Sequence, residues 1–170
     1  MTGAAVRVTS EGIEQAIAAL AAAGAFAHDP SPALDRIGAA MVASTQIRFE
    51  RQAGPDGSPW PPSIRALTEG GITLTKSGRL AQSITHRADP SGVEWGSDLV
   101  YAAPHQFGAT IHAKSAGTLL FKLPGGLGYR RAASVTLPTR PYLGIDDEDE
   151  SEILDILADF ARGLGAEGDV

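Results

Sequence analysis

The chain has 170 residues, 43% of them hydrophobic and 20% charged, so it can bury a single core and does not have the composition of a disordered protein. It contains no cysteine, which excludes disulfide bonds, thiolate catalysis and cysteine-based zinc sites. The net charge of −6 is uneven: residues 1–140 carry 13 Lys and Arg against 10 Asp and Glu, whereas residues 141–170 carry 1 against 10. Such asymmetry is typical of an interaction surface, although a solvated helix end gives the same count.

Nothing in the sequence predicts a membrane protein. The first residues lack an apolar run behind a basic segment, so we expect no secretory signal. The Ala-rich run over residues 16–27 is too short and too weakly apolar to span a bilayer. We therefore expect a soluble protein without a membrane partner.

Two helices are predicted before the first proline-rich segment. The first covers residues 11–23, where isoleucine and leucine recur at helical spacing. The second has Ser31 as its N-cap and Pro32 as its first helical residue, and runs to about Gln52. Its predicted buried face consists of Leu34, Ile37, Met41, Thr45 and Phe49.

A loop and a hairpin follow. Residues 53–63 contain four prolines and two glycines, which are incompatible with a helix or a central strand. Trp60 is the one large apolar residue of this loop, and we expect it to anchor the loop against the core. Residues 77–83 predict a short helix. Strands over 83–87 and 92–96, around an Asp-Pro-Ser-Gly turn, predict a hairpin with a four-residue connection.

The next region is predicted to leave the sheet. Residues 101–108 predict a turn or short helix ended by Gly108. The glycine-rich basic segment 124–133 predicts a mobile loop, and we expect the stretch 109–133 to be a flexible excursion. Three short strands are predicted nearby, over residues 110–113, 119–123 and 134–137.

The last helix begins in an acidic run. Asp147 and Glu150 have the spacing of a capping box, and acidic residues are favourable at the positive end of a helix dipole. The predicted apolar stripe of this helix is Ile153, Leu157, Phe160 and Leu164.

The order of elements predicts an α+β fold. It has long N-terminal helices, a mostly antiparallel sheet and a C-terminal helix. We divide the chain into an N-terminal helix and loop over residues 1–30, an α+β domain over 31–163 and a flexible C-terminus over 164–170.

No motif predicts catalysis, a cofactor or a metal. The four histidines form neither HxxxH nor HExxH, and the acidic run at residues 146–150 lacks the register of an EF-hand loop. Nucleophile-elbow and phosphate-loop motifs are absent from the sequence. We expect a protein that is not an enzyme; a small hydrolase that uses His105 is the weaker alternative.

A second alternative is a nucleic-acid-binding regulator. Basic residues in the stretch without a motif can meet phosphates, but the negative net charge and the few aromatic residues oppose this reading. The candidate residues for contact with DNA are Lys114, Lys122, Arg130 and Arg131.

Four short segments, in a fixed order, carry a resemblance to a known family. They read F-x-x-Q…P-x-G-x-x-W from residue 49, K-x-G-x-L-x-x-S-I from residue 76, Y-A-x-x-H-Q-x-G from residue 101 and L-P-x-R-P-Y-L-G from residue 137. Together they resemble the phage virion morphogenesis family, the tail completion proteins of contractile-tailed phages and related prophages. Residues 109–136 show no such pattern. The motif residues that we single out are Phe49, Gln52, Pro55, Gly57, Trp60, Tyr101, His105, Gly108, Pro138, Arg140 and Pro141.

Several of these residues have an expected physical role. Gly57 and Gly108 suit turns that need a positive φ. Arg140 lies in stiff, proline-flanked backbone, and we expect its guanidinium to reach a carboxylate.

The resemblance implies a structural protein that completes the tail and joins it to the filled head. Similar proteins form rings around the particle axis, often with sixfold symmetry, which requires head-to-tail contacts between subunits. The implied partners are further copies of the chain, tail tube or sheath proteins, head-connector proteins and packaged DNA. The implied location is the head–tail junction, with the host cytoplasm as the place of assembly. The sequence does not separate a tail-terminator role from a head-completion role.

Overall fold

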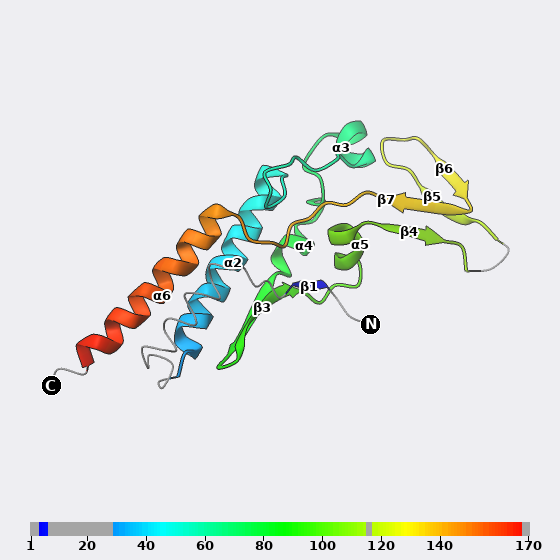
Figure 1. Cartoon of the computed structure of the whole chain (residues 1–170). Coiled ribbons are helices and arrows are strands. Elements are labelled where there is room, and N and C mark those ends of the chain that lie inside the picture. Colours follow the sequence, from blue (N-terminus) through cyan, green and yellow to red (C-terminus); the bar gives the residue numbers. More distant parts are fainter. Residues whose placement is uncertain (1–3, 7–28, 115–116, 168–170) are drawn as a thin grey trace.

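Helix α2 lies at the centre of the molecule. The computed structural model describes three stretches of the chain, namely residues 4–6, 29–114 and 117–167. Figure 1 shows α2, Ser31–Arg51, alongside the C-terminal helix α6, Asp147–Glu167. The antiparallel hairpin of β2, Thr85–Asp89, and β3, Gly92–Ser97, also packs on α2. The predicted α+β class is confirmed.

The other elements are short. In chain order they are β1 (Ala4–Val6), α3 (Ile64–Glu69), α4 (Arg79–Gln82), α5 (Ala102–Phe107), β4 (Ala109–His112), β5 (Leu119–Lys122), β6 (Tyr129–Ala132) and β7 (Ser134–Leu137). Of these elements, α4 and α5 were predicted from the sequence, whereas β1 and α3 were not. The helix predicted over residues 11–23 lies outside the described residues, and the division into three domains stays a prediction.

The predicted buried face of α2 is confirmed. A glycine on this helix lets it approach the hairpin closely, because a Cβ atom at Gly38 would lie 2.3 Å from the ring of His86. The buried residues that the spacing predicted are Leu34, Ile37, Met41, Thr45 and Phe49.

The start of α2 differs from the prediction. Ser31 is the first helical residue and not the N-cap, and Pro30, which precedes it, makes no side-chain cap. The Oδ1 atom of Asp29 accepts hydrogen bonds from the backbone N–H of Ser31 at 3.0 Å and from its hydroxyl at 2.6 Å. A carboxylate is favourable here because the first N–H groups of a helix lack intrahelical partners.

The predicted hairpin is confirmed with a shorter turn. Asp89 pairs with Gly92, so only Pro90 and Ser91 connect β2 to β3, instead of four residues. The carboxylate of Asp89 accepts a hydrogen bond from the N–H of Ser91 at 2.8 Å, which stabilises the tight turn. β1 pairs with the other edge of β3, giving a three-stranded sheet in the order β1-β3-β2.

Residues 109–137, which we call the arm, form two nested antiparallel ladders. β4 pairs with β7, and between them β5 pairs with β6. The expectation of an irregular loop over residues 124–133 is therefore wrong for Tyr129–Ala132, which form β6. The glycines belong only to the turn before β6: Gly125, Gly126 and Gly128 all have positive φ.

The cap of α6 also differs from the prediction. The capping box is formed by Asp146 and Asp149, one residue before the predicted pair of Asp147 and Glu150. The N–H of Asp149 donates to Asp146 at 2.9 Å, and the N–H of Asp146 donates to Asp149 at 3.0 Å. Of the predicted apolar stripe, Ile153 and Leu157 are buried and Phe160 packs against the core; the side chain of Leu164 lies outside the described part.

Candidate assembly site

Three aromatic rings join the end of α2 to the chain before α6. Phe49 packs edge to face on Trp60, with ring centroids 5.4 Å apart, and lies 5.1 Å from the ring of Tyr142. Trp60 is 5% exposed, and its indole N–H donates to the carbonyl oxygen of Pro141 at 2.8 Å. The expected anchoring role of Trp60 is thus confirmed. We call this region the motif junction: Phe49, Gln52, Trp60, Gln106, Arg140 and Tyr142.

Gln106 is the polar centre of the motif junction. Its buried side-chain oxygen accepts hydrogen bonds from the N–H groups of Tyr142 and Leu143, at 2.9 and 3.0 Å. Its side-chain nitrogen donates to the carbonyl oxygen of Leu143 at 2.9 Å. One glutamine therefore binds the extended segment as a neighbouring strand would. Gln106 lies inside the third family segment, but its role was not predicted from the sequence.

Gln52 and Tyr142 fix the same region. The side-chain oxygen of Gln52 accepts a hydrogen bond from the N–H of Thr73 at 2.7 Å, and its carbonyl oxygen accepts one from the N–H of Trp60 at 2.8 Å. The hydroxyl of Tyr142 donates to the carbonyl oxygen of Ala102 at 3.0 Å, and burial raises the pKa of this hydroxyl. Polar side chains here bind backbone and hold loops in place.

Among the described residues, Arg140 forms no ion pair with a carboxylate, contrary to what we expected. Its Nε atom donates to the carbonyl oxygen of Pro61 at 2.6 Å, and one terminal nitrogen lies 3.5 Å from that of Pro62. Pro61 and Pro62 lie outside any helix or strand, so their carbonyl oxygens need a donor from elsewhere, and the side chain of Arg140 supplies it. Burial lowers the pKa of Arg140, yet the group remains a cation.

His105 lies next to Arg140 and shows no catalytic pairing in the described part of the chain. Its backbone oxygen accepts a hydrogen bond from the N–H of Arg140 at 2.8 Å, and its ring lies edge to face with Tyr101. The buried Nδ1 atom has no hydrogen-bond partner among the described residues. Burial, with a smaller contribution from the charge of Arg140, lowers the pKa of His105. In the part of the chain that the structure describes, no hydroxyl or carboxylate is hydrogen-bonded to the ring, so the hydrolase alternative gains no support there.

The two motif glycines for which a positive φ was predicted have that conformation. Gly57 and Gly108 both have φ of 72°. A Cβ atom at Gly108 would also lie 3.0 Å from the side chain of Thr139. Pro55 packs on Gly144, where a Cβ atom would lie 2.6 Å from the proline ring. Pro138 is exposed, at the point where the arm rejoins the core.

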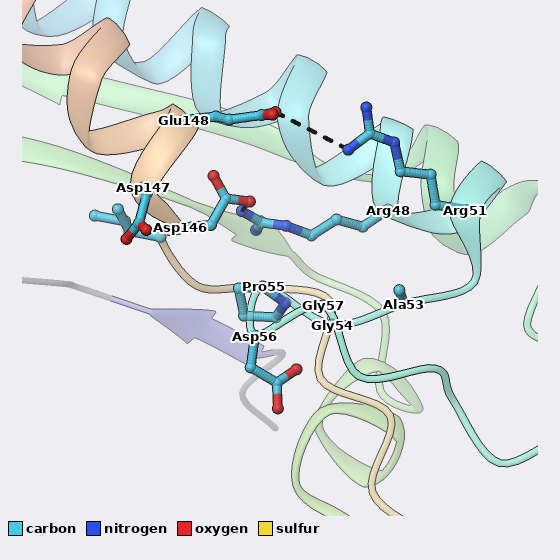
Figure 2. A pocket seen from close by; sticks show the side chains of 11 residues that line it. Arg48, Arg51, Ala53, Gly54, Pro55, Asp56, Gly57, Asp146, Asp147 and Glu148 are labelled. Carbon is cyan, nitrogen blue, oxygen red and sulfur yellow. Dashed lines mark hydrogen bonds and ion pairs between the residues drawn. The ribbon is translucent and has the colours of Figure 1, made fainter.

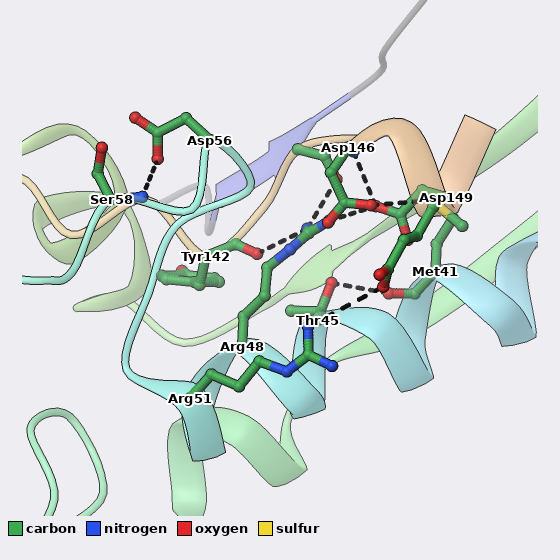
Figure 3. A network of polar contacts seen from close by, with 11 residues as sticks. Met41, Thr45, Arg48, Arg51, Asp56, Ser58, Tyr142, Asp146 and Asp149 are labelled. Atoms are coloured by element: carbon green, nitrogen blue, oxygen red, sulfur yellow. Dashed lines mark hydrogen bonds and ion pairs between the residues drawn. The ribbon is translucent and has the colours of Figure 1, made fainter. Parts of the chain in front are cut away.

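A buried arginine that no motif indicated connects α2 to α6. Figure 3 shows Arg48 reaching the capping box of α6, where it pairs with Asp149 and lies 2.9 Å from Asp146. It also donates to the carbonyl oxygen of Gly144 at 2.8 Å. Arg48 is 4% exposed, so both helix ends depend on one desolvated cation. Burial alone would raise the pKa of Asp146, but hydrogen bonds from the N–H of Asp149 and from Arg48 lower it on balance.

An open cleft lies beside this buried pair. Figure 2 shows it between the end of α2, the loop over residues 53–57 and the start of α6. Arg51 and Glu148 face each other at its rim, 4.0 Å apart and largely exposed. Among the described residues no three His, Asp or Glu side chains gather as metal ligands would. The cleft is therefore lined by charged residues, but those that the structure describes are not arranged as a metal site.

The four candidate DNA-binding residues lie on the arm and are all exposed. Lys114 follows β4, whereas Lys122, Arg130 and Arg131 belong to the β5–β6 ladder. Lys122 and Arg131 share one face of that ladder, and Arg130 lies on the other, because Cα partners alternate between faces. They therefore do not form one continuous patch, and contact with DNA stays a prediction.

The arm also exposes large apolar residues. Leu120 is 60% exposed and Tyr129 is 68% exposed. Where the arm turns back, the N–H of Gly125 donates to Glu69 of α3 at 2.7 Å. A largely apolar groove lies under the arm, lined among others by Ile64, Leu80, Tyr101, His105, Val135 and Leu137.

Within the described residues, no helix has the length and hydropathy needed to cross a bilayer.

Comparison with known proteins bears on this architecture directly. The chain is 34% identical over 128 residues to "Putative capsid assembly protein G" of Escherichia phage Mu, which covers 70% of this chain and 71% of that protein. A comparison with solved structures finds no match. The family model of the phage virion morphogenesis family matches residues 8–160, which include all four sequence segments and nearly the whole described fold. The chain therefore belongs to the phage virion morphogenesis family and serves the assembly of a phage particle.

Proposed function

We propose that this chain completes the phage tail and joins it to the filled head, as one subunit of a ring at the head–tail junction. Membership of the family supports a role in particle assembly, and the Mu relative is itself described as an assembly protein. Its partners are further copies of the chain, proteins of the tail tube or sheath, and head-connector proteins. The protein acts by binding and shape, without turnover.

The arm is the observation that carries the proposal. It extends from the core on the side away from α6 (Figure 1), and it exposes apolar and cationic side chains. An isolated two-stranded ladder is marginally stable in water, so such an arm is best explained by contacts made in an assembly. The motif junction fixes the base of the arm, because α5 and the segment from residue 138 both bind there through Gln106 and Arg140.

The rigid junction explains why the family segments are spread along the chain. The first, third and fourth segments supply the residues of the junction, and their side chains mostly bind backbone carbonyl oxygens and N–H groups. Such a network positions neighbouring loops without creating a reactive group. On the arm, Lys114, Lys122, Arg130 and Arg131 stay our candidates for contact with packaged DNA.

Complementation of a phage mutant tests the proposal. A phage or prophage deleted for this gene should accumulate filled heads and separate tails, which electron microscopy of the lysate will show. Purified protein added to the lysate should restore joined, infectious particles. Incubating the protein first with tails and then, in a parallel experiment, first with heads will show which structure it completes; we expect the tail. Normal particles from the deletion mutant would contradict the proposal.

A further inference from the structure

The β5–β6 ladder has one strongly exposed face with a mixed character. Leu120 pairs with Arg131, and Lys122 pairs with Tyr129, which places these four side chains on the same face. All four are exposed, whereas Leu119, Phe121 and Ala132 of the opposite face are half-buried. We call Leu120, Lys122, Tyr129 and Arg131 the outer face of the arm.

The cations of the outer face belong to a segment without acidic residues, although Glu69 of α3 lines one pocket with Lys122 and accepts a hydrogen bond from the N–H of Gly125. Residues 99–145 contain no Asp or Glu. Within the described ranges, neither Lys122 nor Arg131 takes part in an ion pair. An exposed face of two cations and two large apolar residues is suited to an acidic partner with some apolar surface.

Helix α6 presents such a surface. Glu148, Glu152, Asp155 and Asp159 follow one another at spacings of four, three and four residues, so they form a stripe along one side of the helix. All four are exposed, and Leu154, which is 41% exposed, lies on the same solvent-facing half of the helix, about 100° around its axis from Asp155. We call these four residues the acidic stripe.

The middle of the acidic stripe is available to a partner. Its ends are engaged at exposed positions, where Asp159 lies 3.6 Å from Arg36 and Glu148 lies 4.0 Å from Arg51. In the part of the chain that the structure describes, Glu152 and Asp155 make no ion pair.

One molecule cannot satisfy both surfaces by itself. Figure 1 shows the arm and α6 on opposite sides of the fold, with α2 and the β2–β3 hairpin between them. A contact between the arm of one copy and α6 of the next uses two different surfaces, and such heterologous contacts build rings when the rotation closes.

We propose that the outer face of the arm docks on the acidic stripe of α6 in a second copy of this chain. Lys122 and Arg131 lie against Glu152 and Asp155, and the apolar residues Leu120 and Tyr129 cover the surface around Leu154. This inference rests on the proposed ring, and it names the two surfaces that would form its repeated contact.

Charge reversal tests the contact in solution. The variant Lys122→Glu/Arg131→Glu and the variant Glu152→Lys/Asp155→Lys should each associate about tenfold more weakly in sedimentation velocity, because attraction becomes repulsion. Both reversals in one chain, or an equimolar mixture of the two variants, should restore association. The control Arg79→Glu/Arg87→Glu changes the net charge by the same amount as the arm reversal, but on α4 and β2. It should associate as the wild type does. Circular dichroism confirms that each variant is folded.

Thiol crosslinking tests the same contact in assembled particles. The chain has no cysteine, so Leu120→Cys and Ser151→Cys introduce the only thiols. A short bismaleimide should link the doubly substituted chain into a ladder of several subunits, and either single variant should give no ladder. This measurement decides the matter if the purified chain is monomeric and assembles only on the tail.

Three results would overturn the contact. The first is reversal variants that associate or join particles as well as the wild type. The second is the lack of restoration by the compensating reversals, and the third is the lack of a crosslinked ladder in particles. Loss of a salt-dependent mobility shift of duplex DNA in the arm reversal, with sedimentation unchanged, would assign the outer face to DNA instead. If one of these results is found but wild-type protein still joins heads and tails, only the contact is refuted and the proposed function stands. If instead the deletion mutant makes complete particles, the proposed function is refuted. Restored association of the compensating reversals in solution would still support the contact in that case.

Discussion

Trp60 is the residue that links the proline-rich loop to the segment before α6. It buries its ring against Phe49 and donates its indole N–H to Pro141. A large aromatic residue among prolines is a signal that a sequence shows openly. Gln106, Arg48 and Arg140 are equally buried, but their roles depend on backbone groups brought close only by the fold. The sequence therefore predicts the apolar anchor Trp60, but it does not predict the hydrogen-bond partners of Gln106, Arg48 and Arg140.

Replacing Trp60 by alanine should destabilise the protein by about 3–5 kcal/mol, because a buried aromatic ring and its contacts are lost. Denaturant unfolding will measure the change. The control Trp60→Phe keeps apolar contact with Phe49 and should cost less. A loss for Trp60→Ala within about 0.5 kcal/mol, the range of surface substitutions, would show that the loop is held in another way.

His105 makes stability depend on pH. Burial and Arg140 lower its pKa in the folded state below the value of 6.5 expected when unfolded. The unfolded chain then binds the proton more readily, so the stabilisation is present above pH 6.5 and is lost as the pH falls toward the folded pKa.

The free energy of unfolding of the wild type should therefore fall as the pH is lowered below 6.5 toward the folded pKa of His105. His105→Gln should remove part of this dependence, whereas His112→Gln, at an exposed position on β4, should retain it. Equal pH dependence in the wild type and both variants would contradict the assigned environment of His105.

At the scale of elements, local pattern predicts most helices and misplaces their ends. All five residues predicted for the buried face of α2 are buried, but both long helices use a carboxylate cap at a different position from the one expected. In α6 several acids in a row offer alternative capping boxes, and Arg48 favours the pair of Asp146 and Asp149 because it contacts both. That selection is tertiary, so spacing alone could not make it.

The arm shows the same limit for strands. β6 consists of Tyr-Arg-Arg-Ala, which has no alternation of apolar and polar residues, and it is a strand because it pairs with β5. β1 is three residues long and depends on β3 in the same way. Short strands without their own apolar face are specified by their neighbours.

Shortening the arm should separate folding from assembly. The N–H of Ala113 donates to the carbonyl oxygen of Ala133 at 3.1 Å, so an Asn-Gly turn can replace residues 114–132 and close the β4–β7 ladder. The shortened chain should keep the circular dichroism and cooperative unfolding of the core, since α2, α6 and the β2–β3 hairpin are unchanged. It should not restore joined particles in the mutant lysate.

Two results would contradict this view of the arm. An unfolded variant would show that the arm belongs to the core. Full restoration of particles by a folded variant would show that the arm is dispensable for assembly.

At the scale of the whole molecule, the fold class and the family follow from the sequence. The order of helices and strands predicts α+β architecture, and four ordered motifs identify the family that the family model confirms. The surfaces that we propose for contact with further copies do not follow from a motif, because the arm is the region where no motif is recognised. Its geometry, with opposite character at opposite sides of the fold, is what favours a head-to-tail ring.

The most direct test of the central claim is electron cryomicroscopy of the neck of the intact particle. We expect a ring of density at the head–tail junction into which this fold fits, with the arm of each subunit against α6 of the next. Particles that lack the protein, or that carry it at another place than the junction, would contradict the account.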